Sequence, residues 1–467
     1  MQPGQFLATA LAAIGFVAAA AASLHALLHK RRPQSAFGWI ALCFTLPLAG
    51  ALLYYLFGIN RVEIRARKLL TGHPALECPT EYVGTPPPAL LPLSRLGFAV
   101  SGWPLTAANR VELLHDAAAI FDAMIAAIEA AREYVYFSTY IFDGGALGRR
   151  FAVALAAAAE RGADVRVLLD GVGEWYSWER ASDLFRGTRV RFARFLPPRI
   201  WPPTIRVNLR NHRKILVVDG DAAFTGGINV RDRYLDGAEG ERIVDSHCRI
   251  TGPVVTQIET VFLRDWQFTT ADASSAPRRL SQPAGDALCR AIADGPDSAL
   301  DRLTTLITGA IGSARRRVAI MTPYFVPPRE LVAPLQAAAL AGIDVAVILP
   351  ARNNLPYVHR ATRHMLWELL QRGVHVYYQP PPFVHSKLFY VDDYYAQVGS
   401  ANFDARSLRL NFELNVEVFD RDTVTSLASH FEAIRARSLR LTLEDVDKRP
   451  VLTKAIDGVA WLFSPYL

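Results

Sequence analysis

Two copies of one polar motif contain the residues of this sequence best suited to chemistry. The first copy reads NHRKILVVDGDAAFTGGIN and the second reads VHSKLFYVDDYYAQVGSAN, so the pattern H-x-K-x4-D-x6-G-x2-N occurs twice without a gap. A lone histidine on an apolar strand is more often a satisfied core residue, but coincidence does not explain a whole pattern that recurs. The recurring functional groups belong to His212, Lys214, Asp219 and Asn229 in the first copy and to His385, Lys387, Asp392 and Asn402 in the second.

The spacing within each motif indicates one shared ligand. Side chains two positions apart on a strand project from the same face, so His212 and Lys214 point together, as do His385 and Lys387. An imidazole can attack phosphorus near neutral pH, and a second, protonated imidazole can donate to the leaving oxygen. The chemistry that fits is phosphodiester transfer, in which one histidine attacks and the other protonates. The symmetry of the motifs does not say which histidine has which role.

The other motif residues have supporting roles. The lysine ammonium groups and the amides of Asn229 and Asn402 would hold the phosphate oxygens during the displacement. Asp219 and Asp392 follow the lysines at an odd interval and point away from the ligand on a continuous strand, so we interpret them as supporting residues. This chemistry needs no metal ion and no cofactor. The absence of clustered carboxylates or Cys/His ligand spacing agrees, although a metal site built from distant residues stays open.

A catalytic histidine also needs a partner that fixes its tautomer. The next strand of each copy supplies an acid, Asp245 in DSHCRI and Glu413 in ELNVEV. We expect these two acids to orient the histidines. A solvated carboxylate at a strand end remains the alternative for each, because the two acids lie at unequal distances from the histidines of their own copies.

The segments before the motifs repeat as well. Val135–Phe142 and Val318–Phe325 are β-rich apolar runs, each followed by an Ala- and Leu-rich helical stretch and then by a second matched strand, Gly162–Leu169 and Gly342–Leu349. Strand, helix, strand indicates a βαβ unit, and the glycines stand where a helix would end. The sequence predicts an α/β fold of two pseudo-symmetric domains.

The domain boundaries follow from this repeat and from two linkers rich in proline or small polar residues. We expect a membrane anchor over residues 1–60, a linker over 61–100, a first α/β domain over 101–270, a linker over 271–290 and a second α/β domain over 291–467.

The anchor contains two uncharged apolar stretches, at about residues 6–28 and 37–59, each as long as the roughly 20 residues of a membrane-crossing helix. We expect two transmembrane helices, with Pro47 tolerated where lipid and a neighbouring helix enforce helicity. A cleaved signal peptide is the alternative for the first stretch, and a buried soluble hairpin is the alternative for the second. The mean hydropathy of +0.14 agrees with a membrane protein.

Charge and cysteines bear on the compartment. Fewer positive residues lie between the spans than after the second span, which favours a cytoplasmic catalytic region. Those between the spans are Lys30, Arg31 and Arg32, and those after the second span are Arg61, Arg65, Arg67 and Lys68. Cys78, Cys248 and Cys289 show no disulfide framework, which suits a reducing compartment. The net charge of +7 suits an anionic partner, and anionic lipid is more economical than nucleic acid for a membrane-anchored chain.

The paired motifs resemble the HKD motifs of the phospholipase D superfamily over about residues 100–467. The two leading spans, MTPYFVP at 321–327, SANFDARSLRLNFELNVE at 400–417 and the closing LFSPYL resemble one branch, the bacterial cardiolipin synthases. The resemblance implies phospholipase D-like domains with the active site at their interface, in a multi-pass protein of the bacterial inner membrane. It also implies a phosphohistidine intermediate, with His212 as the nucleophile and His385 as the general acid.

The implied reaction transfers a phosphatidyl group between two phosphatidylglycerols and yields cardiolipin and glycerol. A phospholipase with water as the acceptor is the nearest alternative, followed by phosphatidylserine synthesis, a nuclease and a non-enzymatic membrane scaffold. Two aromatic segments, 175–178 (WYSW) and 195–203 (FLPPRIWPP), would form an interfacial lip near the site, with ordinary loop packing as the alternative.

Overall fold

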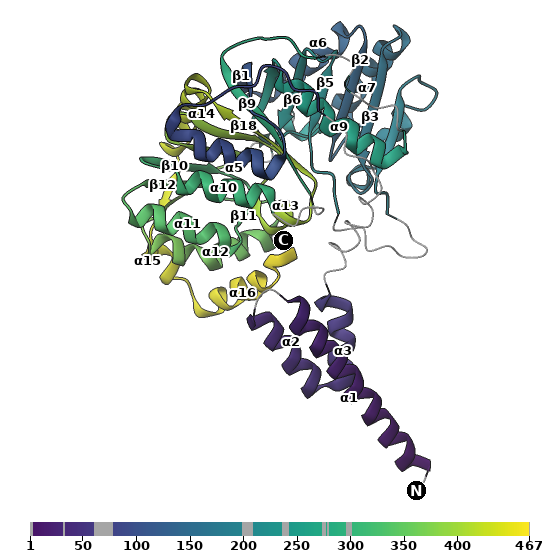
Figure 1. Ribbon diagram of the computed structural model, residues 1–467, viewed down its shortest axis with the longest axis vertical. Coiled ribbons are helices and arrows are strands. Elements are labelled where there is room, and N and C mark those ends of the chain that lie inside the picture. Colours follow the sequence, from purple (N-terminus) through teal and green to yellow (C-terminus); the bar gives the residue numbers. More distant parts are fainter. Residues whose placement is uncertain are drawn as a thin grey trace. The chain divides into compact units, whose positions relative to one another are not determined.

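The computed structural model describes residues 3–30, 33–59, 78–198, 209–235, 242–272, 277, 280–295 and 301–466 (Figure 1). The chain divides into two compact units, Met1–Lys68 and Leu69–Leu467. The expectations for Arg31, Arg32 and the basic residues 61–68, and for residues 199–203 of the aromatic lip, lie outside the described residues.

The N-terminal unit consists of helices α1 (Pro3–His29), α2 (Pro33–Thr45) and α3 (Pro47–Leu53), followed by a π-helical turn at Tyr54–Gly58. Within α1, Thr9–His29 is long and apolar enough to cross a membrane. The second expected span is not one continuous helix. It breaks at Leu46, whose φ of −131° and ψ of 74° are not helical, and Pro47 starts the next helix. The residue before a proline is pushed out of the helical region, and here that local preference prevails.

The larger unit is built around one sheet of fifteen strands. The first half of the repeat supplies β1 (Thr106–Leu114), β2 (Tyr134–Thr139), β3 (Asp164–Asp170), β4 (Arg191–Phe195), β5 (Ile215–Val218), β6 (Ala222–Gly226) and β8 (His247–Thr251). The second half supplies β9 (Ala287–Asp294), β10 (Arg317–Met321), β12 (Asp344–Pro350), β13 (His375–Gln379), β15 (Leu388–Val391), β16 (Tyr395–Gly399), β18 (Glu413–Phe419) and β19 (Leu439–Leu441).

The strand order makes the internal repeat visible. From the junction outward, one side reads β1-β8-β6-β5-β2-β3-β4 and the other reads β9-β18-β16-β15-β10-β12-β13, with β19 added at the far edge. The two sides match strand for strand. Because β1 pairs with β9, the halves share a single sheet, and the α/β class expected from the sequence is confirmed. Two small ladders also join separate segments, β7 (Ile243–Val244) with β14 (Phe383–Val384) and β11 (Phe325–Val326) with β17 (Phe403–Asp404).

Helices cover the sheet (Figure 1). They are α5 (Leu91–Ser101), α6 (Ala117–Ala130), α7 (Ala146–Glu160), α8 (Ala181–Leu184), α9 (Val254–Thr270), α10 (Arg302–Gly312), α11 (Arg329–Leu340), α12 (Pro356–Leu370), α13 (Ala405–Arg409), α14 (Arg421–Arg435), α15 (Leu443–Asp447) and α16 (Val451–Leu462). Helices α7 and α11 connect parallel strand pairs, as the βαβ pattern predicted. Helix α5 lies inside the segment expected to be a linker and packs on α10, so this segment is structured before residue 101.

The repeated glycines end the crossover helices. Gly162 follows α7 with φ of 100° and Gly342 follows α11 with φ of 87°, a left-handed conformation that glycine adopts without steric cost. Each half then buries its own apolar core between sheet and helices. One long helix of each half crosses the junction, because α9 packs against β9 and α14 packs against β1. These exchanges fix the two motif-bearing halves against each other.

Candidate active site

The two histidine-lysine segments lie immediately before strands β5 and β15, and each forms a hydrogen bond with the opposite half. The backbone N–H of His212 donates to the carbonyl of Phe412 at 2.9 Å, and that of His385 donates to the carbonyl of Val244 at 2.7 Å. Each histidine is therefore held by backbone from the other copy of the repeat.

The acids serve the histidines of the opposite halves. Glu413 Oε2 lies 3.0 Å from His212 Nδ1, and Asp245 Oδ2 lies 2.7 Å from His385 Nδ1. The assumption that each acid pairs with the histidine of its own copy was wrong. The histidine segments cross the junction between the halves, whereas Glu413 lies on β18 and Asp245 lies just before β8. Both carboxylate side chains are fully buried, so they are not solvated strand-end groups. The contact with Glu413 is at Nδ1 of His212 and so leaves its Nε2 for another partner, whereas Nε2 of His385 lies 3.3 Å from Lys387 Nζ.

The lysines fold back onto their own segments. Lys214 Nζ donates to the carbonyl of His212 at 2.6 Å, and Lys387 Nζ donates to the carbonyl of His385 at 2.6 Å. Lys387 Nζ also lies 3.0 Å from His385 Nδ1. Burial lowers the pKa of Lys387 to about 8, against the opposing effect of Asp245 and Glu413. Burial also lowers the pKa of Lys214 well below its ordinary value.

Burial dominates the electrostatics of the histidines. It lowers the pKa of His212 to about 4 although Glu413 raises it, and it lowers the pKa of His385 to about 4 although Asp245 raises it. Both imidazoles are then neutral at pH 7 in the absence of a ligand. The charge of Lys387 acts on the pKa of His212 and that of Lys214 acts on the pKa of His385, so the two pairs lie within electrostatic reach of each other.

The motif aspartates stand apart from the histidines. Asp219 accepts hydrogen bonds of 2.8 to 2.9 Å from the backbone amides of residues 132–134, where the chain enters β2. Asp392 accepts bonds of 2.8 to 3.0 Å from the amides of residues 315–317, where the chain enters β10. Both have positive φ, 51° and 53°. Each carboxylate therefore holds the turn at the end of its motif strand, β5 or β15, against the start of the neighbouring strand, β2 or β10.

The motif asparagines make contacts with nearby loops. Asn229 Oδ1 accepts from the backbone N–H of Ile141 at 3.2 Å, and Asn402 Nδ2 donates to Ser407 Oγ at 3.2 Å. Both side chains are buried. Asn229 thus contacts the segment that follows β2, whereas Asn402 contacts helix α13.

Several residues of the site were not expected from the sequence. Tyr140 has its ring centroid 5.4 Å from that of His212, and Tyr324 lies 6.0 Å from His385, so each imidazole has an aromatic neighbour. A tyrosine near the end of each apolar run, in STYIF and MTPYF, was the available signal. Ser246 Oγ donates to Ser386 Oγ at 3.1 Å and links residues adjacent to Asp245 and His385. A serine beside an acid carries no such signal in the sequence.

The family follows from comparison with known proteins. The profile described as "Cardiolipin synthase, PLD-like domain" matches residues 124–266 and 307–435, and each range contains one of the two motifs. The chain belongs to this cardiolipin synthase family. A second profile, described as "Phospholipase D-nuclease N-terminal", matches residues 17–58.

Full-length relatives agree with this family. Cardiolipin synthase of Geobacillus kaustophilus is 32% identical over 94% of this chain and 90% of its own. Cardiolipin synthase A of Pseudomonas putida is 35% identical over 96% of this chain and 95% of its own. The crystal structure of phosphatidylserine synthase from Haemophilus influenzae covers 80% of this chain and all of its own, with a TM-score of 0.63 at 16% identity, and shows the same fold.

The described residues contain no group of three or more His, Cys, Asp or Glu side chains arranged to hold a metal ion. What the arrangement offers is two imidazoles, each oriented at Nδ1 by a buried carboxylate, beside two lysines. Such a set can attack and protonate at a phosphodiester.

Proposed function

We propose that this chain transfers a phosphatidyl group from one phosphatidylglycerol to another, giving cardiolipin and glycerol. The observation that carries the proposal is the crossed pair of His–carboxylate contacts, which join the two motifs in one site, in a chain whose relatives are cardiolipin synthases over nearly their full length. In this proposal the halves are two pseudo-symmetric phospholipase D-like domains, and the site lies at their interface.

The first step forms a covalent intermediate. His212 Nε2 attacks phosphorus of the first phosphatidylglycerol, the bond from phosphorus to the headgroup glycerol breaks, and His385 gives its proton to that glycerol oxygen. His385 must be protonated for this step, although burial keeps it neutral in the free site. A phosphodiester anion brings negative charge into the pocket and raises the pKa of both imidazoles.

The second step returns the proton. A hydroxyl of the second phosphatidylglycerol attacks the phosphorus of the phosphohistidine, His385 takes the hydroxyl proton, and the P–N bond to His212 breaks. One phosphodiester replaces another, so no nucleotide or metal is part of the proposal. Lys214, Lys387 and the amides of Asn229 and Asn402 are proposed to hold the nonbridging oxygens.

The acceptor must be a lipid hydroxyl rather than water, and membrane attachment raises the local concentration of that lipid. We propose a multi-pass anchor, with α1 as one span and the α2 and α3 segment as the second, in the bacterial inner membrane with the catalytic unit in the cytoplasm. Trp175 and Trp178 are exposed, and the Tyr176 ring meets that of Tyr140 edge-on, with centroids 6.1 Å apart, while the Tyr140 ring in turn meets that of His212. This segment is proposed as an interfacial lip beside the site.

The test is product analysis with the purified full-length protein and phosphatidylglycerol in detergent micelles. Cardiolipin and glycerol in equal amounts support the proposal. Phosphatidic acid as the sole lipid product would replace it with a hydrolase, and unchanged phosphatidylglycerol would reject both. His212→Ala and His385→Ala serve as controls for activity carried over from the host membrane.

A further inference from the structure

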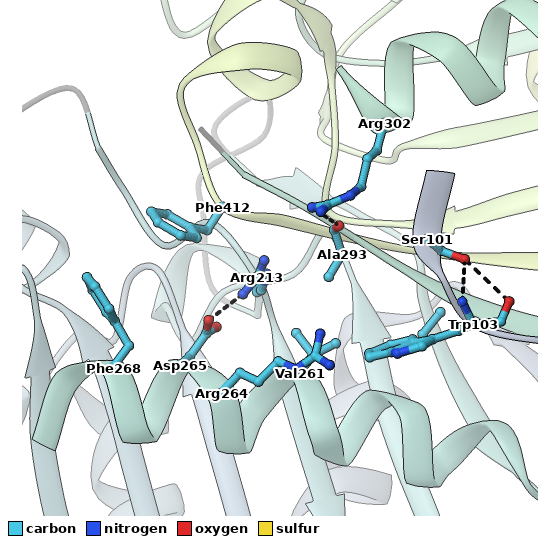
Figure 2. A pocket seen from close by; sticks show the side chains of 11 residues that line it. Ser101, Trp103, Arg213, Val261, Arg264, Asp265, Phe268, Ala293, Arg302 and Phe412 are labelled. Atoms are coloured by element: carbon cyan, nitrogen blue, oxygen red, sulfur yellow. Dashed lines mark hydrogen bonds and ion pairs between the residues drawn. The ribbon is translucent and has the colours of Figure 1, made fainter. Parts of the chain in front are cut away.

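A phospholipid substrate needs apolar surroundings for its acyl chains, and the cavity behind the first motif is too small to supply them. This cavity has a volume of about 130 Å³, and Arg213 and Asp265, which form an ion pair, are among the residues that line it (Figure 2). Pockets for drug-sized ligands begin at roughly 300 Å³, and a phospholipid is larger than such a ligand. The acyl chains therefore stay outside this cavity.

Helix α16 presents an apolar surface on the outside of the second half. Seven side chains on α16 and at its end are exposed and consist of hydrocarbon alone, and the six larger ones are between 42% and 83% exposed. Because an α-helix has about 3.6 residues per turn, these positions fall within one arc of about 140° on the helix surface. We call this surface the α16 face. Its residues are Val451, Leu452, Ala455, Ile456, Val459, Leu462 and Phe463.

The polar side of α16 is turned toward the protein. Asp457 is fully buried and forms ion pairs with Arg363 at 2.6 Å and with Arg449 at 2.7 Å. Trp461 packs on the core of this half and lies beside His364 of α12, with ring centroids 5.0 Å apart. A surface helix ordinarily buries its apolar stripe and exposes its charges. Here the ion pairs hold the helix with its apolar stripe outward.

The surroundings of the α16 face favour a lipid bilayer as its partner. Hydrocarbon side chains offer no hydrogen bonds to a protein partner, and the acyl region of a bilayer requires none. Thr9–His29 is long and apolar enough to cross a membrane, so a bilayer is at hand in the anchored protein. Three partly exposed arginines on the polar side share Asp457 as their ion-pair partner, which suits anionic headgroups. They are Arg360, Arg363 and Arg449.

The end of the α16 face is connected to the second motif. The turn at Ser464–Tyr466, which follows α16, packs against α13. Ser407 of α13 in turn accepts a hydrogen bond from Asn402 Nδ2 at 3.2 Å. One short helix thus joins the apolar surface to a residue that is proposed to hold the phosphate. A bilayer on the α16 face would present lipid headgroups to the site while the acyl chains remain in the membrane.

We propose that the α16 face docks the catalytic unit on an anionic lipid bilayer, with its side chains in the boundary between headgroups and acyl chains. Amphipathic helices that lie in the plane of a membrane bind in this way. Exposed apolar patches of this kind mark interaction surfaces. Contact with lipid does not depend on the proposed function, whereas an effect of docking on turnover rests on it.

The first test measures whether the α16 face meets lipid in the full-length protein. Cys78→Ser removes the one cysteine of the four that is not buried, and a bimane fluorophore is then attached to the Val459→Cys variant. In nanodiscs of phosphatidylcholine and phosphatidylglycerol we expect strong quenching by nitroxide-labelled acyl chains and weak quenching by aqueous iodide. Val153→Cys, at an exposed valine of α7, is the matched control and should show the reverse.

Two results of this measurement would overturn the docking surface. Strong quenching of the Val459→Cys label by iodide would show that the α16 face stays in water. Protection from both quenchers would show that protein covers it, either a second copy of the chain or the helices of the anchor.

A second test measures the use of the surface in turnover. In the double variant Leu452→Gln with Val459→Gln, the KM for phosphatidylglycerol in nanodiscs should rise by roughly tenfold with kcat nearly unchanged, because less apolar area enters the bilayer. A short-chain phosphatidylglycerol below its micelle concentration should be turned over as by the unmodified protein. Val153→Gln is the matched control for the loss of an exposed apolar side chain, and thermal unfolding checks that each variant folds.

The two tests fail independently. An unchanged KM in the double variant would overturn the role of docking in turnover. Absence of turnover in every variant and in the unmodified protein, together with quenching of the Val459→Cys label by lipid, would reject the proposed function and still support the docking surface.

Discussion

The two histidine–carboxylate pairs occupy equivalent places in the repeat but are built differently. Glu413 is held by three side chains, because besides His212 it accepts from Ser400 Oγ at 2.5 Å and from Asn411 Nδ2 at 3.1 Å. Asp245 accepts from His385 and from the backbone amide of Ser246 at 2.8 Å. Burial acts to raise the pKa of Glu413, but its interactions with His212, Lys214 and Ser400 outweigh that effect and hold the pKa below its ordinary value.

The difference arises at one position of the motif. The GSAN turn of the second half has Ser400 where the GGIN turn of the first half has Gly227. A Cβ on Gly227 would lie 2.3 Å from Asp245 Oδ1, so this position must stay bare for the acid to fit. A firmly ionised carboxylate keeps the proton of the imidazole at Nδ1 and leaves a lone pair at Nε2. The comparison therefore supports His212 as the nucleophile in our proposal and His385 as the general acid.

Loss of either imidazole should have the largest effect. We expect His212→Ala and His385→Ala each to lower kcat by about 10³-fold or more, because the two groups act as a unit. With a p-nitrophenyl phosphatidyl ester, whose leaving group needs no proton, His385→Ala should still form the covalent adduct and His212→Ala should not. Intact mass spectrometry measures the adduct. An adduct on His385 in the His212 variant would reverse the assignment.

Replacement of the carboxylates should have the second largest effect and should distinguish the two histidine–carboxylate pairs. Glu413→Gln should lower kcat by about 10³- to 10⁴-fold, because the wrong tautomer of His212 presents N–H to phosphorus, and Asp245→Asn should cost about 10²-fold, because proton donation is one part of the step. Steady-state turnover of phosphatidylglycerol measures both. Glu330→Gln, on the surface of α11, is the control. A larger loss in Asp245→Asn than in Glu413→Gln would contradict the proposed division of roles.

Much of the fold could be predicted from the sequence, because it follows local rules. The apolar runs, the helix-ending Gly162 and Gly342, and the order strand, helix, strand are each set within a few residues. The crossing of the acids could not be predicted, since it depends on the contact between His212 and Phe412 from opposite halves. Pro47 itself indicates a helix break at Leu46, because the residue before a proline disfavours the helical conformation. The expectation of one continuous span gave more weight to the stabilisation of helices by lipid.

Exchange of the turn residues should have a smaller effect. Ser400→Ala removes a hydrogen bond to a charged group, worth about 1.5–3 kcal/mol, so we expect kcat to fall by roughly 10- to 100-fold. Gly227→Ser does not build the same clamp around Asp245, since its Cβ collides with the carboxylate. We expect a loss there too. Thermal unfolding of both variants separates local misplacement from loss of fold. A gain of activity in Gly227→Ser would show that the two turns are interchangeable.

The smallest expected difference lies between the lysines and appears only in alkaline solution. Lys387 Nζ contacts the imidazole of His385 as well as its carbonyl, whereas Lys214 Nζ contacts the carbonyl of His212 and lies 5.8 Å from the centroid of the Tyr140 ring. The pKa of Lys387 is lowered to about 8 by burial, so its ammonium is present below that pH and is lost as the pH rises through it. A plot of log(kcat/KM) against pH should therefore bend downward near pH 8, because this parameter reports the free enzyme.

In Lys387→Arg the side chain stays charged and the bend should disappear, whatever the residual rate. A bend that persists in Lys387→Arg but disappears in Lys214→Arg would assign the titration to Lys214 and place the more weakly held charge beside the nucleophile.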